Sequence, residues 1–317
     1  MTVEHSALVT DPRLSDPQAA RHVADLLAAR NGWPTPPQIG VEATRRRTAR
    51  ERTPDDVEVV TDDVLVPGGD GPRSARWYLP TRGVITTSVL FLHGGGWALG
   101  DLEMNDAMAR ELARLSRCAI LSLDYRLAPE YPYPAALQDT LCALRWLATE
   151  SVEHAGRSRL VIAGHSAGGN LAAVAAQLTR DGQVPPLDAQ VLLCPVLDCD
   201  VDRDSYYRYG EDLLLTRDEM IWYWDMYHPD HDGRDRPELS PIRTSSAAGL
   251  PPTTIVVAGA DPLRDESFDY ANLLVSAGVP TDVHCAEGVP HLFLTFPSMP
   301  VRDHALAVAA RGLAGAR

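Results

Sequence analysis

A serine between glycines carries the clearest chemical signal in the sequence: the motif GHSAG at residues 164–168 has Ser166 at its centre. The motif follows a short apolar run and opens a segment of helical character, so Ser166 is expected at a turn from a strand into a helix. Such a turn strains the backbone at the serine, and only small neighbours tolerate it. The helix N-terminus behind the hydroxyl favours developing negative charge. We therefore predict that Ser166 is a nucleophile, against the alternative of a serine that only caps an ordinary helix.

A second glycine-rich motif, HGGGW at residues 93–97, suits the oxyanion that acyl transfer through a serine creates. An oxyanion needs convergent N–H donors, and glycines let backbone amides approach a substrate oxygen closely. We predict that two of the three amides of Gly94, Gly95 and Gly96 serve, joined by the amide of Ala167. The rival interpretation is a phosphate-binding loop, but the motif lacks the lysine of GxxxxGK[ST] and the spacing of GxGxxG.

A serine nucleophile needs a base, and in an α/β-hydrolase the chain order is serine, acid, histidine. Five histidines follow Ser166, namely His228, His231, His284, His291 and His304. His284 lies inside the last predicted strand, His304 lies in the C-terminal helix, and His228 and His231 lie among aspartates in a stretch predicted to be a solvated loop rather than a metal site. His291 follows the last strand by a short loop, 286–290, and is the predicted base.

The orienting acid is expected at the carboxyl end of the preceding strand. Asp261 comes just after the predicted strand Thr254–Ala258. Asp265 and Glu266 fall where the next helix begins, so they are expected to serve that helix N-terminus instead. We therefore predict Asp261 as the acid.

The elements that must position these groups alternate along the chain from Val57 onward. The stretches Val57–Val66 and Ala75–Leu79 flank a Pro- and Gly-rich turn and predict an antiparallel hairpin. Apolar strands then alternate with helices, which indicates a mostly parallel sheet covered on both faces, with its sites at the carboxyl ends of the strands. The strands are expected at Val89–Leu92, Ala119–Leu123, Leu160–Ala163, Gln190–Leu193, Thr254–Ala258 and Asp282–Cys285, and the helices at Ala135–Thr149, Ala167–Arg180, Arg264–Ser276 and Val301–Gly312.

Two segments stand outside this alternation. About 60 residues separate two of the strands, far beyond a usual βα connection, and they are rich in aromatics that include Tyr206 and Trp222. Such an insertion is typical of a lid; its aromatics either line a substrate pocket or only join helices together. Residues 1–53 predict helical pieces, whose basic run (Arg45, Arg46, Arg47, Arg50 and Arg52) is interpreted as a solvated helix face rather than an anion site.

Composition excludes several classes of partner. The 317 residues are 45% hydrophobic and 23% charged, as in an ordinary globular domain. A formal net charge of -14 repels phosphate backbones and anionic lipid, so nucleic acid is not an expected partner. The sequence contains no run of about 18 apolar residues, so a membrane-spanning helix is not expected.

The cysteines and the first residues bear on the compartment. Five scattered cysteines are expected to be free rather than in disulfides or a metal site: Cys118, Cys142, Cys194, Cys199 and Cys285. The opening stretch MTVEHSALVTDPRLSD lacks the basic region and apolar run of a secretory signal. We predict a reducing cytoplasm.

With these residues assembled, the chain resembles the bacterial hormone-sensitive-lipase family of α/β-hydrolase esterases. The resemblance covers about Val57 to the C-terminus. It depends on HGGGW at 93–97, DYRLAPE at 124–130, GHSAGGN at 164–170, DPLRDE at 261–266 and VPHLF at 289–293. Several independent motifs in the right order make it more specific than any one of them.

The resemblance implies a single α/β-hydrolase domain over 1–317, with a cap formed by about 1–53 and 199–245. It implies that Ser166, Asp261 and His291 form the triad, and that the HGGG amides with Ala167 form the oxyanion hole. It also implies hydrolysis of short- to medium-chain acyl esters without a cofactor or metal. Arg126 and Glu130 are expected to pair and brace the HGGG loop. The state of assembly, monomer or homodimer, stays open.

Two departures from the family pattern bear on substrate choice. His165 stands before the nucleophile, where an acidic residue or Thr is common, and Leu292 replaces the usual Gly after the catalytic histidine. We expect the substrate-binding residues to include Trp97, His165, Leu292, Tyr206 and Trp222. An amidase, lactonase, deacetylase or acyltransferase would use the same acyl-enzyme, and a non-catalytic ligand-binding homologue is a further alternative.

Overall fold

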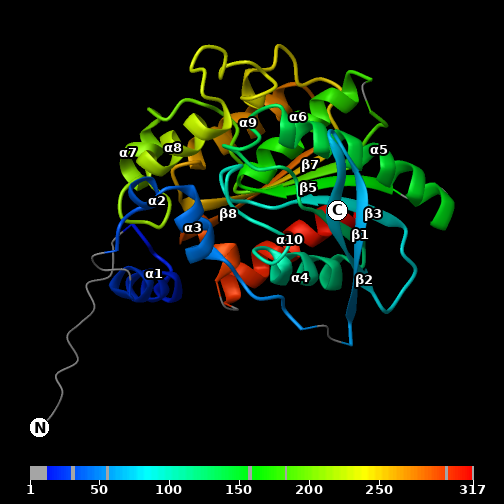
Figure 1. Cartoon of the computed structure of the whole chain (residues 1–317), viewed down its shortest axis with the longest axis horizontal. Coiled ribbons are helices and arrows are strands. Elements are labelled where there is room, and N and C mark those ends of the chain that lie inside the picture. Colours follow the sequence, from blue (N-terminus) through cyan, green and yellow to red (C-terminus); the bar gives the residue numbers. More distant parts are fainter. Residues whose placement is uncertain are drawn as a thin grey trace, which may run out of the picture.

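One eight-stranded sheet lies at the centre of the computed structural model, which describes residues 13–29, 33–54, 57–155, 159–182, 184–296 and 299–315 (Figure 1). The strand order is β1-β2-β4-β3-β5-β6-β7-β8. Strands β3 to β8 are parallel, whereas β1 and β2 pair antiparallel with each other and β2 pairs antiparallel with β4. The strands are β1 (Val59–Gly68), β2 (Gly71–Pro80), β3 (Thr87–Leu92), β4 (Ala119–Leu123), β5 (Arg159–His165), β6 (Ala189–Leu193), β7 (Thr253–Ala260) and β8 (Thr281–Pro290). The predicted hairpin and mostly parallel sheet are confirmed.

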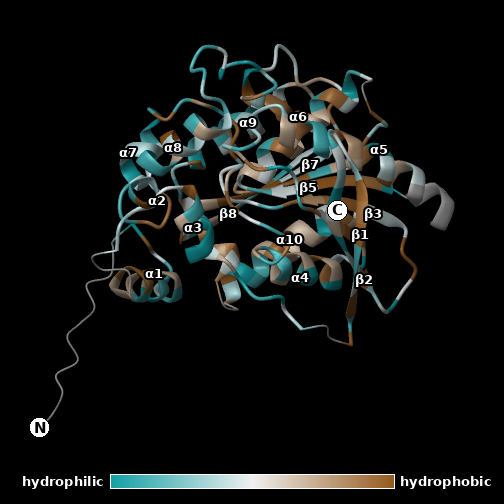
Figure 2. Cartoon of the chain, viewed as in Figure 1, coloured by the Kyte–Doolittle hydropathy of each residue, from teal (hydrophilic) through white to brown (hydrophobic). Residues whose placement is uncertain are grey.

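Both faces of the sheet are buried, as the continuous apolar strands predict. In β3 every residue is buried: Val89 and Phe91 pack into one hydrophobic cluster, and Leu90 and Leu92 pack into the other. Successive side chains of a strand point to opposite faces, so an all-apolar strand needs helices on both sides. Figure 2 shows the hydrophobic colour along the central strands and the hydrophilic colour on outer helix turns and loops.

Helices cover the two faces. α4 and α10 pack together on the cluster that contains Phe91, and α5, α6 and α9 contribute to the cluster that contains Leu90. In Figure 1 these two groups lie below and above the sheet. The helices are α1 (Pro17–Ala29), α2 (Pro36–Ile39), α3 (Val41–Thr48), α4 (Asp106–Ser116), α5 (Ala135–Ala155), α6 (Ala167–Arg180), α7 (Asp204–Tyr209), α8 (Arg217–Tyr227), α9 (Arg264–Ser276) and α10 (Pro300–Ala314), with the short 3₁₀ turns η1 (Pro241–Arg243) and η2 (His291–Thr295). Among the helices that the structure describes, none combines the length and the apolar character needed to cross a bilayer.

The two segments predicted to form a cap meet in space. Helix α2 of the N-terminal segment packs against α8 of the long insertion, although the two are far apart in sequence. Residues 1–12 and 30–32 of the N-terminal segment, including most of the opening stretch compared with a secretory signal, lie outside the described residues.

The last strand is longer than the sequence predicts. Residues Ala286–Pro290 were expected to be a loop, but β8 continues through Pro290 and pairs there with Ala260 of β7. A register shift between Ala258 and Ala260 lets the pairing continue past the apolar run on which the prediction depended. His291 therefore follows directly from a strand end.

Candidate active site

Ser166 sits at a strained turn between β5 and α6. Its backbone has φ 55° and ψ -117°, outside the regions that most residues prefer. A Cβ on Gly164 would lie 2.1 Å from the carbonyl oxygen of Gly168, and a Cβ on Gly168 would lie 2.1 Å from that of Leu92. These contacts explain why glycine is required on both sides of the serine.

Hydrogen bonds from neighbouring loops hold this conformation. The amide of Ser166 donates to the carbonyl of Leu193 at 2.8 Å, and its carbonyl accepts from the amides of Asn170 and Val196 at 3.1 and 3.2 Å. The strain is therefore compensated by bonds on both sides of the turn, and the hydroxyl is positioned at the carboxyl end of the sheet.

The structure brings Ser166, His291 and Asp261 together. His291 Nε2 lies 2.9 Å from Ser166 Oγ, and His291 Nδ1 lies 2.7 Å from Asp261 Oδ2. The three side chains are buried, and each comes from the carboxyl end of a different parallel strand: β5, β8 and β7. With the Nδ1 proton donated to the carboxylate, Nε2 is free to accept the serine proton, so the arrangement can activate a hydroxyl as a nucleophile.

The loop after β7 fixes the carboxylate. The second oxygen of Asp261, Oδ1, accepts a hydrogen bond from the amide of Leu263 at 3.0 Å. Cys194 Sγ also lies near, because Cys194, Asp261 and His291 place one ligand atom each within 4.8 Å of one another. Burial raises the pKa of the Cys194 thiol, so the sulfur keeps its proton. With both oxygens of Asp261 and both nitrogens of His291 already bonded, the group suits proton transfer better than a metal ion.

The HGGGW loop (residues 93–97) lies beside Ser166. Gly95 and Gly96 have φ of 120° and 59°, and a Cβ on Gly95 would lie 2.3 Å from the carbonyl oxygen of Leu99. Within the part of the chain that the structure describes, the amides of Gly94, Gly95 and Gly96 donate no hydrogen bond. The loop can therefore offer N–H donors to an oxygen that develops negative charge near Ser166.

His93 and Tyr125 support the start of this loop. Tyr125 Oη donates to the carbonyl of His93 at 2.8 Å, and the two rings stack with centroids 4.2 Å apart. His93 Nδ1 lies 2.8 Å from the carbonyl oxygen of Gly94. Burial lowers the pKa of His93 to about 4, so this imidazole is neutral at physiological pH.

The predicted pair of Arg126 and Glu130 does not form. Arg126 Nε bonds Asp139 at 2.9 Å, and Glu130 is bonded instead by Arg45 at 2.8 Å, which lowers the pKa of the Glu130 carboxyl. Arg45 also donates to the carbonyls of Ala98 and Ala128, both at 2.8 Å. The prediction was wrong because the partner of Glu130 lies 85 residues away in the N-terminal segment.

Arg45 also departs from its predicted environment. The basic run was interpreted as a solvated helix face, but the side chain of Arg45 is only 29% exposed and ties α3 to the loop behind HGGGW. Arg46 is 72% exposed, as expected. Arg47 and Arg50 line a pocket.

A pocket of about 390 Å³ opens above Ser166, within the usual range for small ligands. We call it the Ser166 pocket. Of the predicted site residues it contains Gly94, Gly95, Gly96, His165, Ser166, His291 and Leu292. The rest of its wall is formed by Trp33, Pro36, Thr44, Arg47, Thr48, Arg50, Glu51, Thr53, Leu99, Glu103, Met104, Asn105, Ala107, Leu214, Leu215, Glu219, Met220, Tyr223 and Thr295.

Three predicted substrate contacts lie outside this wall. Trp97 is fully buried, with its ring stacked on Tyr227 at 4.3 Å, and Tyr206 is buried in the core. Trp222 packs against Tyr223, with ring centroids 5.1 Å apart, and is not among the residues that line the pocket. Helical periodicity turns Glu219, Met220 and Tyr223 inward together, because residues three and four apart share a face.

The ring of His165 lies beside that of His291, with centroids 5.7 Å apart and planes inclined by 17°. His165 is 2% exposed, and burial, together with the neighbouring His291 and His93, lowers its pKa to about 3. The imidazole is therefore neutral and adds no positive charge beside the base.

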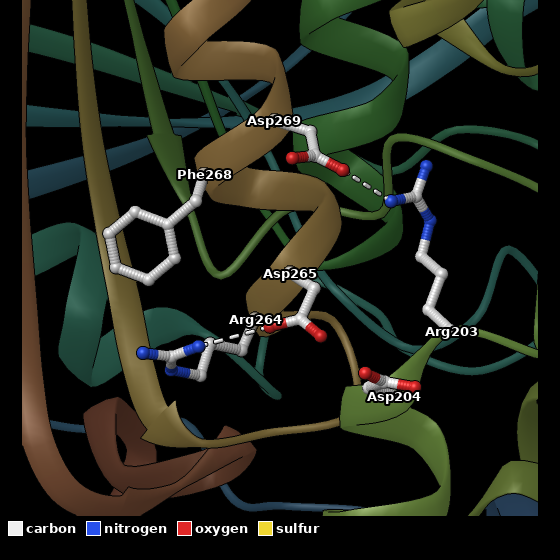
Figure 3. Close-up of a pocket in the computed structure, with 6 residues that line it drawn as sticks. All are labelled: Arg203, Asp204, Arg264, Asp265, Phe268 and Asp269. Carbon is white, nitrogen blue, oxygen red and sulfur yellow. Dashed lines mark hydrogen bonds and ion pairs between the residues drawn. The ribbon is translucent and has the colours of Figure 1, made fainter.

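A second hollow, of about 480 Å³, lies apart from the Ser166 pocket (Figure 3). Four of its five charged side chains are paired within the wall: Arg203 bonds Asp269 at 2.6 Å, and Arg264 bonds Asp265 at 3.0 Å while lying over the Phe268 ring. The fifth charged residue, Asp204, has no ion pair with the other residues of this wall (Figure 3).

Asp265 and Glu266 do fall in the first turn of α9, but their carboxylates serve other segments. Asp265 accepts from the amide of Ser205 at the start of α7. Glu266 is fully buried and accepts from the amide of Leu197 at 2.7 Å, and burial raises the pKa of its carboxyl. Neither approaches His291, so Asp261 is the acid that the fold brings to the histidine.

Comparison with known proteins identifies the family to which the chain belongs. A family model described as alpha/beta hydrolase fold matches residues 89–295. Carboxylic ester hydrolase LipN of Mycobacterium tuberculosis is 40% identical over 247 residues, which are 75% of this chain and 65% of that relative, so the match spans less than two thirds of its length. Ethyl acetate hydrolase of Pseudomonas putida is 30% identical over 297 residues, 90% of this chain and 93% of the relative.

Solved structures agree with the family model. The crystal structure of a thermostable esterase from Pseudomonas putida ECU1011 superposes with a TM-score of 0.88 at 29% identity, covering 96% of this chain and 98% of that one. The resemblance to hormone-sensitive-lipase esterases is confirmed, and the chain belongs to the α/β-hydrolase fold family.

Proposed function

We propose that this chain is a serine carboxylesterase in which Ser166 is the nucleophile, His291 the general base and Asp261 the acid that orients it. The observation that carries the proposal is the continuous pair of hydrogen bonds, 2.9 Å and 2.7 Å long, from Ser166 through His291 to Asp261. Relatives named as ester hydrolases, at 30–40% identity, support the same activity.

The reaction proceeds in two half-reactions. His291 Nε2 takes the proton of Ser166 as Oγ attacks the ester carbonyl carbon, and the imidazolium then returns this proton to the leaving alkoxide, so that an alcohol departs and an acyl-serine remains. Water then gives a proton to His291 and attacks the acyl-serine. The same proton passes to Ser166 Oγ, and the carboxylic acid is released. Asp261 keeps the Nδ1 proton in place and stabilises the imidazolium in both steps.

Backbone amides stabilise the oxyanion of each step. We assign this role to two of the three glycines Gly94, Gly95 and Gly96, together with the first amide of α6, that of Ala167. One such donor contributes about 2.7–4 kcal/mol of transition-state stabilisation. His165 is neutral at physiological pH, so it adds no positive charge beside His291.

The proposed substrates are uncharged esters with short to medium acyl chains, without a cofactor. A pocket of about 390 Å³ holds a small ester, and residues from the proposed cap segments (1–53 and 199–245) form much of its wall. The ring of Tyr223 on α8 lies against Gly96 and limits the space beyond the HGGGW loop. The relative named for ethyl acetate supports the short-chain end of this range. All five cysteines are free, which supports a reducing compartment such as the cytoplasm.

Ser166→Ala tests the proposal directly. We expect it to lower kcat/KM for p-nitrophenyl butyrate by about 10⁴-fold or more, while circular dichroism and thermal unfolding stay as in the wild type. Ser122→Ala, at a buried serine of β4, is the matched control and should keep full activity. A fluorophosphonate should label the wild type and Ser122→Ala but not Ser166→Ala, with the mass added on the peptide of Ser166. Full esterase activity in Ser166→Ala would contradict the assignment.

A further inference from the structure

Asn105 stands at the N-cap of α4 but does not cap the helix. Asparagine is among the residues most favoured at an N-cap, because its side-chain oxygen accepts a hydrogen bond from an amide of the first turn. Here the side chain makes no such bond. Helix capping therefore does not explain what this amide does.

The amide is also buried without a protein partner. Asn105 is 3% exposed, and its Oδ1 accepts no hydrogen bond from the residues that the structure describes. Buried polar side chains in native proteins are nearly always hydrogen-bonded, since an unpaired amide loses its hydration without compensation. Oδ1 is sealed from solvent, whereas Nδ2 is not among the fully buried unpaired atoms; because Asn105 belongs to the wall of the Ser166 pocket, its N–H groups are the part of the amide that a molecule in the pocket can reach.

Three threonine hydroxyls of the same wall differ from Asn105, whereas both ring nitrogens of His165, also in this wall, have no partner among the described residues. The hydroxyls of Thr44, Thr48 and Thr295 donate to the carbonyls of Gly40, Thr44 and Leu292, at 2.8, 2.9 and 2.7 Å. Their hydrogen bonds are made inside the protein. Asn105, by contrast, makes no side-chain hydrogen bond within the part of the chain that the structure describes.

The position of Asn105 indicates which half of an ester it meets. Helix α4, which begins next to Asn105, packs against η2, which begins at His291. Leu292 and Thr295 of η2 line the same pocket as Asn105. In the proposed reaction His291 Nε2 delivers its proton to the leaving oxygen, so the alcohol half of the ester lies beside η2 and α4.

We propose that Asn105 hydrogen-bonds a hydroxyl group on the alcohol half of the substrate, so that the enzyme prefers esters of hydroxylated alcohols such as diols over esters of simple alkanols. This proposal rests on the proposed esterase function. A site built to bond a substrate hydroxyl rejects the analogue that lacks it, because the buried amide is then left unpaired in the complex.

Two pairs of nearly isosteric substrates test whether a hydroxyl is recognised on the alcohol half or on the acyl half of the ester. 2-Hydroxyethyl acetate and propyl acetate differ by a hydroxyl against a methyl on the alcohol half. Ethyl glycolate and ethyl propionate differ in the same way on the acyl half. Each is assayed by acid release with the wild type, Asn105→Leu and Asn105→Ala. Leucine matches asparagine in shape, alanine removes the bulk, and neither substitution removes a helix cap.

For the alcohol pair, we expect the ratio of kcat/KM, hydroxylated over plain, to fall about tenfold in both variants, equivalent to about 1.4 kcal/mol. Comparing ratios between proteins cancels the different intrinsic reactivities of the two esters. The ratio for the acyl pair should not change. Asn272→Leu, the same substitution at an exposed position of α9 outside the pocket wall, is the matched control and should change neither ratio.

The outcomes separate this inference from the proposed function. If the variants hydrolyse all four esters with the wild-type ratios, or if the acyl pair responds instead of the alcohol pair, the role of Asn105 is wrong while the esterase function stands. If the wild type hydrolyses none of the four esters and no fluorophosphonate labels Ser166, it is the proposed function that fails.

Discussion

Tyr223 of α8 lies against Gly96 of the HGGGW loop so closely that a Cβ at Gly96 would be 2.2 Å from the ring carbons Cγ and Cδ1. This contact joins the long insertion to the glycine-rich loop beside Ser166. A side chain at position 96 would require the Tyr223 ring to move, and the contact limits the space beyond the loop.

Gly96→Ala should lower kcat/KM for p-nitrophenyl butyrate by about 10²–10³-fold, the usual effect of losing one oxyanion donor. The added methyl both meets Tyr223 and disfavours the φ of 59° that Gly96 adopts. Gly278→Ala is the matched control: it has φ 78° with nothing within 4 Å of its Cβ position, so it should lower stability slightly and leave kcat/KM unchanged. Wild-type activity in Gly96→Ala would show that the amide geometry of the loop is not needed.

Tyr223→Ala should shift the preference toward longer acyl chains. Removing the ring opens space beside Gly96, and if about two more methylenes are buried there at about 0.8 kcal/mol each, the kcat/KM ratio of p-nitrophenyl octanoate to butyrate rises about tenfold. Trp222→Ala, at a residue of α8 outside the pocket wall, is the control and should keep the wild-type ratio. An unchanged ratio in Tyr223→Ala would mean that the acyl chain lies elsewhere.

His165 should make the fold less stable in mild acid. Its pKa is lowered to about 3 in the folded state, so between that value and its ordinary 6.5 the unfolded chain binds a proton that the folded chain does not. The lowered pKa of His165 therefore costs no stability above about pH 7. As the pH falls, the free energy of unfolding decreases, by about 2 kcal/mol at pH 5. Urea unfolding of His165→Asn at pH 7 and pH 5 should show a weaker fall than the wild type by about this amount. The exposed His304→Asn serves as control, and equal falls in all three proteins would contradict the buried neutral imidazole.

Arg45→Met should weaken the support behind the HGGGW loop. It removes three interactions, with Glu130 and with the carbonyls of Ala98 and Ala128, and leaves buried acceptors unpaired. We expect a loss of about 1–3 kcal/mol in the free energy of unfolding, together with a lower kcat. Arg46→Met, at an exposed side chain paired only with Glu42 at 3.6 Å, should change neither by a comparable amount. Equal behaviour of the two variants would show that Arg45 is not a brace.

Local sequence was sufficient to predict the residues that are placed by a short motif or by the end of a strand. Ser166 could be predicted because a nucleophile at a strand-to-helix turn demands glycines at fixed offsets, and the structure meets that demand at Gly164 and Gly168. Asp261 and His291 followed from chain order, since the carboxyl ends of parallel strands meet at one edge of the sheet. The exact end of β8 escaped prediction, because strand pairing continued across a register shift that leaves no signature in hydrophobicity.

Partners far apart in the chain could not be predicted in the same way. The expected ion pair between Arg126 and Glu130 is replaced by two others, because tertiary structure decides which of several nearby charges come within bonding distance. Glu130 pairs with Arg45, and Arg126 pairs with Asp139. The orientation of α8 decided that Tyr223 rather than Trp222 meets the pocket, and an aromatic-rich sequence does not specify which face turns inward. Asn105 gave no sign of a special role until its missing cap and its burial were visible.

The sequence by itself determined the sheet, the chain order of the candidate triad and the glycine-rich loop beside it, because each depends on short-range rules of backbone geometry and hydrophobic pattern. Only the tertiary structure decided the shape of the Ser166 pocket, since its wall is assembled from α3, the segment before α4, α8 and η2, which lie far apart in the chain. The catalytic chemistry is thus encoded locally, whereas the choice of substrate depends on how those distant segments pack over Ser166.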